Sequence, residues 1–154
     1  MSPRRIDAIA RMNYLHGRYI KAGKISNDDM LYTLGLFVLE PVRWTAQYDW
    51  RPLTDVEKCA LGLFWKDLGE CMEISFDPLG HQKFGFNDGL AWLEALERWC
   101  SDYEIRNMVP AETNRDIARA TIDIALFNVP KALRGVAWGF ISALFEPRLR
   151  RAML

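Results

Sequence analysis

Apolar residues recur every three or four positions along nearly the whole chain, and no stretch alternates apolar with polar residues as a half-buried strand would. The clearest apolar stripe at helical spacing is made of Val56, Ala60, Phe64, Leu68 and Cys71. It begins within Thr54-Asp55-Val56-Glu57, which has the spacing of a capping box, where the threonine and glutamate side chains bond the free amides of a helix start. The sequence therefore predicts an all-α fold of about six helices.

Start and stop signals divide the pattern into segments. We expect helices over residues 2–21, from 26 through 39, over 54–74, over 88–106, from 110 or 113 onward, and over 130–145. The second helix should kink near Pro41, because proline lacks an amide hydrogen and clashes with the preceding turn. Residues 75–87 are predicted to be loop, and a short basic tail follows Pro147. With no repeat and no low-complexity linker, we predict a single domain over residues 1–154.

The charges balance, with 20 Lys and Arg against 20 Asp and Glu. This chain lacks the basic excess typical of nucleic-acid-binding proteins, so no nucleic-acid partner is expected. The distribution is uneven. Residues 1–24 carry six positive charges and one negative, residues 25–130 carry nine and eighteen, and residues 131–154 carry five and one. The chain is thus acidic in the middle and basic at both ends.

No apolar stretch approaches the roughly twenty residues of a membrane span, and no secretory signal is visible. We expect an intracellular, cytoplasmic protein from these features alone. The apolar segment Val136–Phe145 is bracketed by Lys131, Arg134, Arg148, Arg150 and Arg151. Such a helix can make peripheral contact with an anionic membrane through residues 131–154. It can equally be a buried C-terminal helix whose cations complement the acidic middle, and periodicity does not separate the two.

Few kinds of catalytic chemistry fit this sequence. It has no glycine-rich phosphate loop, no GxSxG and no HExxH, and its three cysteines form no CxxC. The cysteines, at helical spacing among apolar residues, are interpreted as small buried hydrophobic residues. Two histidines, His16 and His81, are too few for a metal site built from several imidazoles. A haem needs only one axial histidine, because the porphyrin supplies the other four ligands.

His16 is the better candidate for an axial ligand. It lies mid-helix on a largely apolar face, with Asn13 one turn earlier, whereas His81 lies in a loop with glycine and proline and is expected to face solvent. Arg11 and Arg18 flank His16 and could meet haem propionates, although their helix faces differ from that of the histidine. The alternative is a core histidine bonded to a carbonyl, which spacing alone favours.

Five strings of residues carry a resemblance to a known family. They are Arg11-Met-Asn-Tyr-Leu-His16-Gly-Arg-Tyr19 and the segments 24–34, 40–44, 49–60 and 108–114. Together they closely resemble the fungal MpaB-type oxygenases, the endoplasmic-reticulum-bound enzymes of mycophenolic acid biosynthesis. That family is related to the bacterial rubber oxygenases, or latex-clearing proteins. The resemblance covers nearly the whole chain and is weakest over residues 75–88.

The resemblance implies a helical domain with a globin-like core and a b-type haem. It further implies an oxidoreductase of fungal secondary metabolism that uses dioxygen to cleave a carbon–carbon double bond in a prenyl or similar apolar chain. Association with the endoplasmic reticulum membrane becomes the alternative to a cytoplasmic location. His16 matches the position of the family's iron-binding histidine, and Arg11 and Arg18 become candidates for the haem carboxylates. No other catalytic residue can be assigned from this sequence.

The first residues depart from the family pattern. An Arg-x-x-x-Thr element belongs upstream of the histidine, and residues 1–15 do not contain it. Full members of the family also carry an N-terminal membrane anchor. The chain therefore resembles the C-terminal part of the catalytic domain, and a second chain is a candidate supplier of the N-terminal half. The alternative function is that of a non-catalytic helical remnant or accessory protein that binds a partner or a membrane surface.

Overall fold

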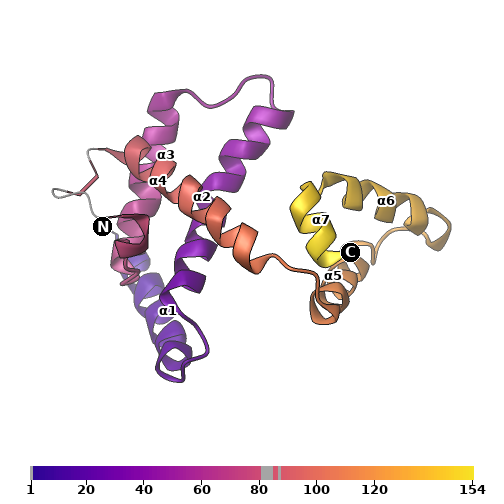
Figure 1. Cartoon of the computed structure of the whole chain (residues 1–154), viewed down its shortest axis with the longest axis horizontal. Coiled ribbons are helices and arrows are strands. Elements are labelled where there is room, and N and C mark those ends of the chain that lie inside the picture. The colour runs from indigo at the N-terminus through magenta and orange to yellow at the C-terminus, as the bar shows by residue number, and fades with distance from the viewer. Residues whose placement is uncertain (1, 81–84, 87) are drawn as a thin grey trace. The chain divides into compact units, whose positions relative to one another are not determined.

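A computed structural model describes residues 2–80, 85, 86 and 88–154, and in these residues the chain forms helices and no strands (Figure 1). The α-helices are α1 (Pro3–Lys21), α2 (Asn27–Tyr48), α3 (Asp55–Cys71), α4 (Gly89–Asn107), α5 (Glu112–Ala125), α6 (Arg134–Leu144) and α7 (Pro147–Met153). Two 3₁₀ turns, η1 (Asp77–Leu79) and η2 (Lys131–Leu133), lie between them. The predicted all-α class is confirmed for the described part of the chain.

The boundaries differ from the prediction mainly towards the C-terminus. The expected short basic tail after Pro147 forms a helix, α7. Pro147 occupies its first turn, where the missing amide hydrogen costs nothing. The helix predicted over 130–145 begins with η2 and becomes α-helical only at Arg134. The end predicted at Ile74 is also wrong: α3 stops at Cys71, and Glu73 has a φ of 61°. Helix α2 continues through Pro41 to Tyr48, and His81 lies outside the described residues.

Two reciprocal capping boxes begin α2 and α3. Ser26 Oγ accepts from the Asp29 amide at 3.1 Å, and the Asp29 carboxylate accepts from the Ser26 amide at 2.8 Å. Thr54 and Glu57 make the equivalent pair of bonds at 3.3 and 2.8 Å. Each box satisfies two amides that the first turn of a helix leaves free. The helix starts predicted at these two positions are confirmed.

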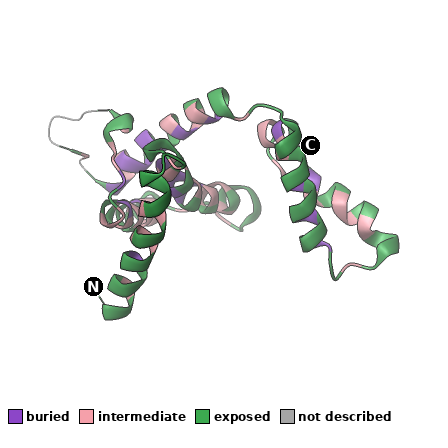
Figure 2. Ribbon diagram, turned by 90° about the horizontal axis from the view of Figure 1, so that it is seen from below, coloured by how far each residue is buried: buried purple, intermediate pink, exposed green. Residues whose placement is uncertain are grey.

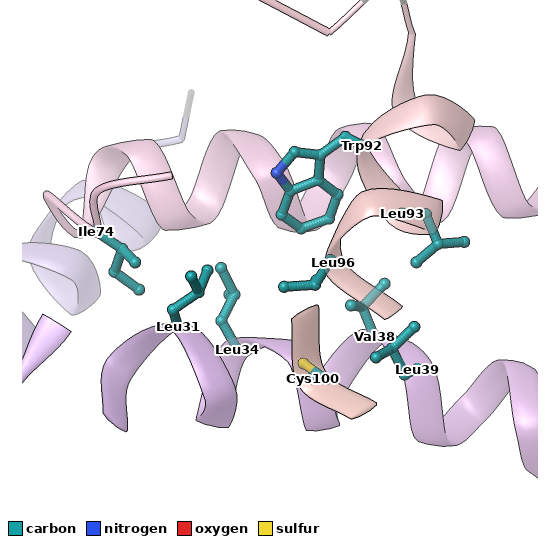
Figure 3. Close-up of a cluster of buried hydrophobic side chains, with 9 residues drawn as sticks. All are labelled: Leu31, Leu34, Val38, Leu39, Ile74, Trp92, Leu93, Leu96 and Cys100. Carbon is teal, nitrogen blue, oxygen red and sulfur yellow. The ribbon is translucent and has the colours of Figure 1, made fainter. Parts of the chain in front are cut away.

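The chain groups into two compact units, Met1–Asp102 and Tyr103–Leu154, which are described separately. The single domain predicted over 1–154 stays a prediction. The core of the first unit is a cluster in which side chains of α2 meet those of α4, with Ile74 at one end (Figure 3). Its buried members are Leu31, Leu34, Val38, Leu39, Ile74, Trp92, Leu93, Leu96 and Cys100. Trp92 is fully buried, and Phe76 meets its ring edge-on at 5.4 Å between centroids.

Glycines let the helices of the first unit approach closely. A Cβ atom at Gly62 would lie 2.3 Å from the carbonyl oxygen of Gly89, so α3 and the start of α4 touch backbone to backbone. A Cβ atom at Gly35 would lie 2.4 Å from Cys100 Sγ, so α2 and α4 are close there as well. These contacts hold α2, α3 and α4 as the framework to which α1 is attached.

The second unit is small and has few fully buried side chains. Ala118 and Ile122 of α5, Leu126 and Ala152 of α7 are its buried apolar residues. Arg148 donates to the buried carboxylate of Glu104 at 3.0 Å, and this ion pair joins α7 to the last turns of α4. Because the Glu104 side chain is only 5% exposed, its charge depends on such partners.

Several large apolar side chains remain exposed on both units. Figure 2 shows buried, intermediate and exposed residues along the helices of each unit. Phe37, Trp44 and Tyr48 share one face of α2 and are each about half exposed, and we call them the α2 aromatic face. Phe37 also stacks on the Trp65 ring of α3 at 5.5 Å between centroids. Val136 and Phe140 of α6 are 76% and 67% exposed, so the C-terminal apolar helix is not simply buried. No helix in the described residues is both long and apolar enough to cross a membrane.

Candidate functional site

The candidate site lies on α1, which long-range side-chain contacts attach to α3. Arg5 pairs with Asp67 at 2.5 Å, and its guanidinium lies 5.6 Å from the centroid of the Phe64 ring. About two turns further along α1, the Asn13 side-chain amide donates to the carbonyl oxygen of Cys71 at 2.9 Å. The face of α1 that carries these residues is therefore turned towards α3. His16 follows Asn13 on that face.

His16 and Asn13 each carry a buried polar atom without a hydrogen-bond partner. These atoms are Nδ1 of the His16 imidazole and Oδ1 of the Asn13 amide. The core histidine expected from spacing alone would use a ring nitrogen to bond a carbonyl, but His16 Nδ1 makes no such bond. An unpaired buried nitrogen costs free energy unless another group occupies it. The imidazole is thus the group on α1 with unused capacity to bind.

Arg11 and Arg18 do not join His16. Both are exposed, and at 100° per residue they lie about 140° and 160° around α1 from the histidine. Arg5 does lie near the angular position of His16, but it is paired with Asp67. The structure therefore places the two predicted propionate partners on the opposite side of the helix.

No group of three or more His, Cys, Asp or Glu side chains in the described residues is arranged to hold a metal ion. None of the three cysteines forms a disulfide: Cys100 is buried, as predicted, whereas Cys59 and Cys71 are half-buried. A metal bound at His16 would therefore have to bring most of its own ligands. Haem does this, since the porphyrin supplies four of them.

A strongly perturbed carboxylate, that of Glu57, lies in the first turn of α3 and not at the α1 site. Arg51 donates to both carboxylate oxygens of Glu57, at 2.7 and 2.8 Å. Together with the hydrogen bonds from Thr54, this holds the pKa of Glu57 far below its ordinary value and raises that of Arg51. The arrangement fixes the start of α3, so its role is structural.

Comparison with known proteins identifies the family. Over 153 residues, 99% of the chain, it is 44% identical to a protein of Penicillium roqueforti named "ER-bound oxygenase mpaB". It is also 44% identical over 153 residues to "ER-bound oxygenase mpaB'" of Penicillium brevicompactum. The chain belongs to the MpaB-type family. It spans only part of these relatives, 51% of the first and 36% of the second.

Two further comparisons gave no match. No family model matches this MpaB-type chain, and no solved structure matches it. The globin-like core implied by the resemblance therefore stays a prediction.

The sequence indicated His16 and placed Asn13 one turn earlier on α1. It held no signal for the bond from Asn13 to Cys71, because these residues are 58 positions apart.

Proposed function

We propose that this MpaB-type chain is the haem-ligating part of an oxygenase and that His16 is the axial ligand of a b-type haem. The observation that carries the proposal is the buried, unpartnered Nδ1 of His16 on the face of α1 that Asn13 shares. The names of the two Penicillium relatives support an oxygenase activity. When bound, the haem would supply the iron at which dioxygen reacts with a carbon–carbon double bond of a prenyl-like chain.

The residues present fit a haem in one respect and not in another. A single histidine with unused nitrogen capacity matches a cofactor that needs one axial protein ligand. Arg11 and Arg18, by contrast, lie on other faces of α1 than His16. Their role as propionate partners stays a prediction, and the proposed site rests on His16 alone.

The neighbours of His16 on its own face are suited to an apolar ligand. Ile9, Met12 and Ile20 lie within about 40° of the histidine around the axis of α1. Ile9 is buried, Met12 is half-buried and Ile20 is exposed, so the apolar strip continues from the core to the surface. In this arrangement the strip would exclude water beside the imidazole and contact a porphyrin edge or an isoprenoid chain.

The remaining walls of the pocket are proposed to come from polypeptide outside the matched region. The relatives are two to three times as long as the part this chain spans, so in them further residues are available to enclose a haem and a substrate. Those residues can belong to the same polypeptide or to a second chain. Both relatives are named as bound to the endoplasmic reticulum, and the same association is proposed for this chain.

A second candidate function is favoured by α6. Its Val136 and Phe140 lie one turn apart on the same face and are exposed, and no charged residue lies between Arg134 and Glu146. A non-catalytic helical protein that contacts a membrane surface through residues 131–154 would use such a face. This function does not need His16, so the two candidates can be tested separately.

Haem reconstitution tests the first candidate. The purified chain is mixed with hemin, passed through a desalting column and examined for a Soret band. We expect a band in the native sequence and in His81→Ala, which changes the other histidine, and its loss in His16→Ala. A circular dichroism spectrum of each variant shows whether the helices are intact. An equal Soret band in folded His16→Ala, or no band in the native sequence, overturns the assignment of His16.

A further inference from the structure

We propose that the α2 aromatic face, extended by Trp50, docks on a zwitterionic phospholipid surface such as one of phosphatidylcholine. The aromatic rings would lie among the headgroups and the upper parts of the acyl chains, with α2 parallel to the membrane surface. The inference deepens the proposed association with the endoplasmic reticulum and rests on it for its setting. It involves neither His16 nor α6.

Trp50 adds a nearly free ring to the α2 aromatic face. It follows the end of α2 by two residues, in the connection that turns the chain at one end of the first unit (Figure 1). The residue is 85% exposed, and the Arg51 guanidinium lies 5.1 Å from the centroid of its ring. Arg51 in turn donates to both carboxylate oxygens of Glu57. The ring is therefore held at the surface by a fixed turn.

The residue types of this surface are those that favour a membrane interface. Trp and Tyr combine an apolar ring with a polar group, and they are enriched where one end of a side chain meets hydrocarbon and the other meets water. Trp44 has its polar group satisfied, because its Nε1 donates to Glu40 at 3.2 Å. Its ring lies 4.9 Å from that of Tyr48 between centroids. The two half-exposed rings thus form one continuous aromatic surface.

The charges around the face favour a zwitterionic surface over an anionic one. Residues 40–58 hold three cations and four anions. Each cation makes an ion pair within this segment: Arg43 with Glu40 at 2.9 Å, Arg51 with Glu57 at 2.7 Å and Lys58 with Asp55 at 3.5 Å. Paired cations and a small negative excess give no net attraction to anionic headgroups. Binding would therefore depend on the aromatic surface and hardly on lipid charge or salt.

The size of the face favours a lipid surface over a second copy of the chain. The α2 aromatic face and Trp50 together expose about 500 Å². A stable protein interface buries about 800 Å² on each partner and needs matched shapes. A fluid lipid surface needs no matched shape, so a patch of this size is sufficient for peripheral contact.

Sedimentation with vesicles of pure phosphatidylcholine tests the inference. We expect the native chain to sediment with them at low and at high salt, and Trp50→Ser to weaken this partitioning about tenfold. Val56→Ser is the matched control, since Val56 is 80% exposed but lies about 180° around α3 from Trp65, which stacks on Phe37. We expect it to bind as the native chain does. Circular dichroism shows whether each variant keeps its helices.

Fluorescence reports the contact directly. The difference in emission between the native chain and Trp50→Phe belongs to Trp50. Phosphatidylcholine with brominated acyl chains should quench this difference, because the ring would lie beside the bromine atoms. An unquenched difference in the presence of bound vesicles overturns the inference.

The remaining outcomes separate this inference from the proposed function. Equal binding by native chain and Trp50→Ser overturns the role of the face but keeps the membrane association, whereas no sedimentation with any vesicle contradicts both. Sedimentation only with phosphatidylserine-containing vesicles assigns the contact to residues 131–154 and overturns the inference. A dimer in sedimentation velocity that Trp50→Ser dissociates assigns the face to a second copy and also overturns it. The Soret band tests His16 and is independent of these results.

Discussion

Replacing Gly62 by alanine should destabilise the first unit, although alanine is the better helix former. The substitution alone gains up to about 1 kcal/mol of helix propensity. The new Cβ, however, would lie 2.3 Å from the Gly89 oxygen and 2.9 Å from its carbonyl carbon, which are backbone atoms and cannot rotate away. Overpacking of this kind costs about 3 kcal/mol, since α3 and α4 must separate. We expect a net loss of about 2 kcal/mol.

Gly17 provides the control for this prediction. It lies inside α1, and a Cβ atom there would meet nothing within 4 Å, so Gly17→Ala should gain about 1 kcal/mol. Urea unfolding followed by circular dichroism at 222 nm gives both free energies of unfolding, which should differ by about 3 kcal/mol. If Gly62→Ala unfolds at the same urea concentration as Gly17→Ala, or at a higher one, the argument from close backbone contact is wrong.

Three other perturbations test separate features. Because the pKa of Glu57 is lowered in the folded chain, its carboxylate stabilises the fold fully at neutral pH, and this effect is lost as the pH falls from about 5 towards 2. Glu57→Gln should therefore flatten this part of the curve of unfolding free energy against pH. An unchanged curve would contradict the role of Arg51. Leu96→Ala, at a position with no exposed surface, should cost about 2–5 kcal/mol in urea unfolding, and a loss below 1 kcal/mol would argue against the described core. Phe140→Asp should reduce sedimentation of the chain with phosphatidylserine-containing vesicles. Val56→Asp, at another exposed apolar position, on α3, should leave it unchanged. Equal effects of the two variants would show that α6 is not the membrane-contacting element.

Helix starts were predictable from sequence because the signals that fix them are local. Ser26 and Thr54 lie three residues before the carboxylates that complete their boxes. Helix ends were less predictable, because tertiary contacts decide them. The apolar stripe of α3 continues past Cys71, yet the helix stops there. At that end the side-chain amide of Asn13, on α1, donates to the Cys71 carbonyl oxygen. Pro147 was interpreted as a separator, whereas proline also suits a first helical turn.

The candidate site was predictable in position but not in composition. Helical spacing placed His16 and Asn13 on one face and Arg11 and Arg18 on others, and the structure agrees with these angular positions. The two arginines were suggested by charge and by the family resemblance, and their role stays a prediction. The unpaired Nδ1 and Oδ1 atoms depend on which groups of α3 approach α1, and periodicity carries no information about that approach.

The α2 aromatic face has a consequence for how the chain responds to denaturant. Phe37, Trp44 and Tyr48 are about half exposed, so together they keep roughly 300 Å² of aromatic surface in water in the folded chain. Surface that is already exposed in the folded chain adds nothing to the slope of unfolding free energy against urea, because that slope scales with the surface newly exposed on unfolding. Polar substitutions on this face should therefore leave the slope unchanged and move the unfolding midpoint far less than Leu96→Ala does.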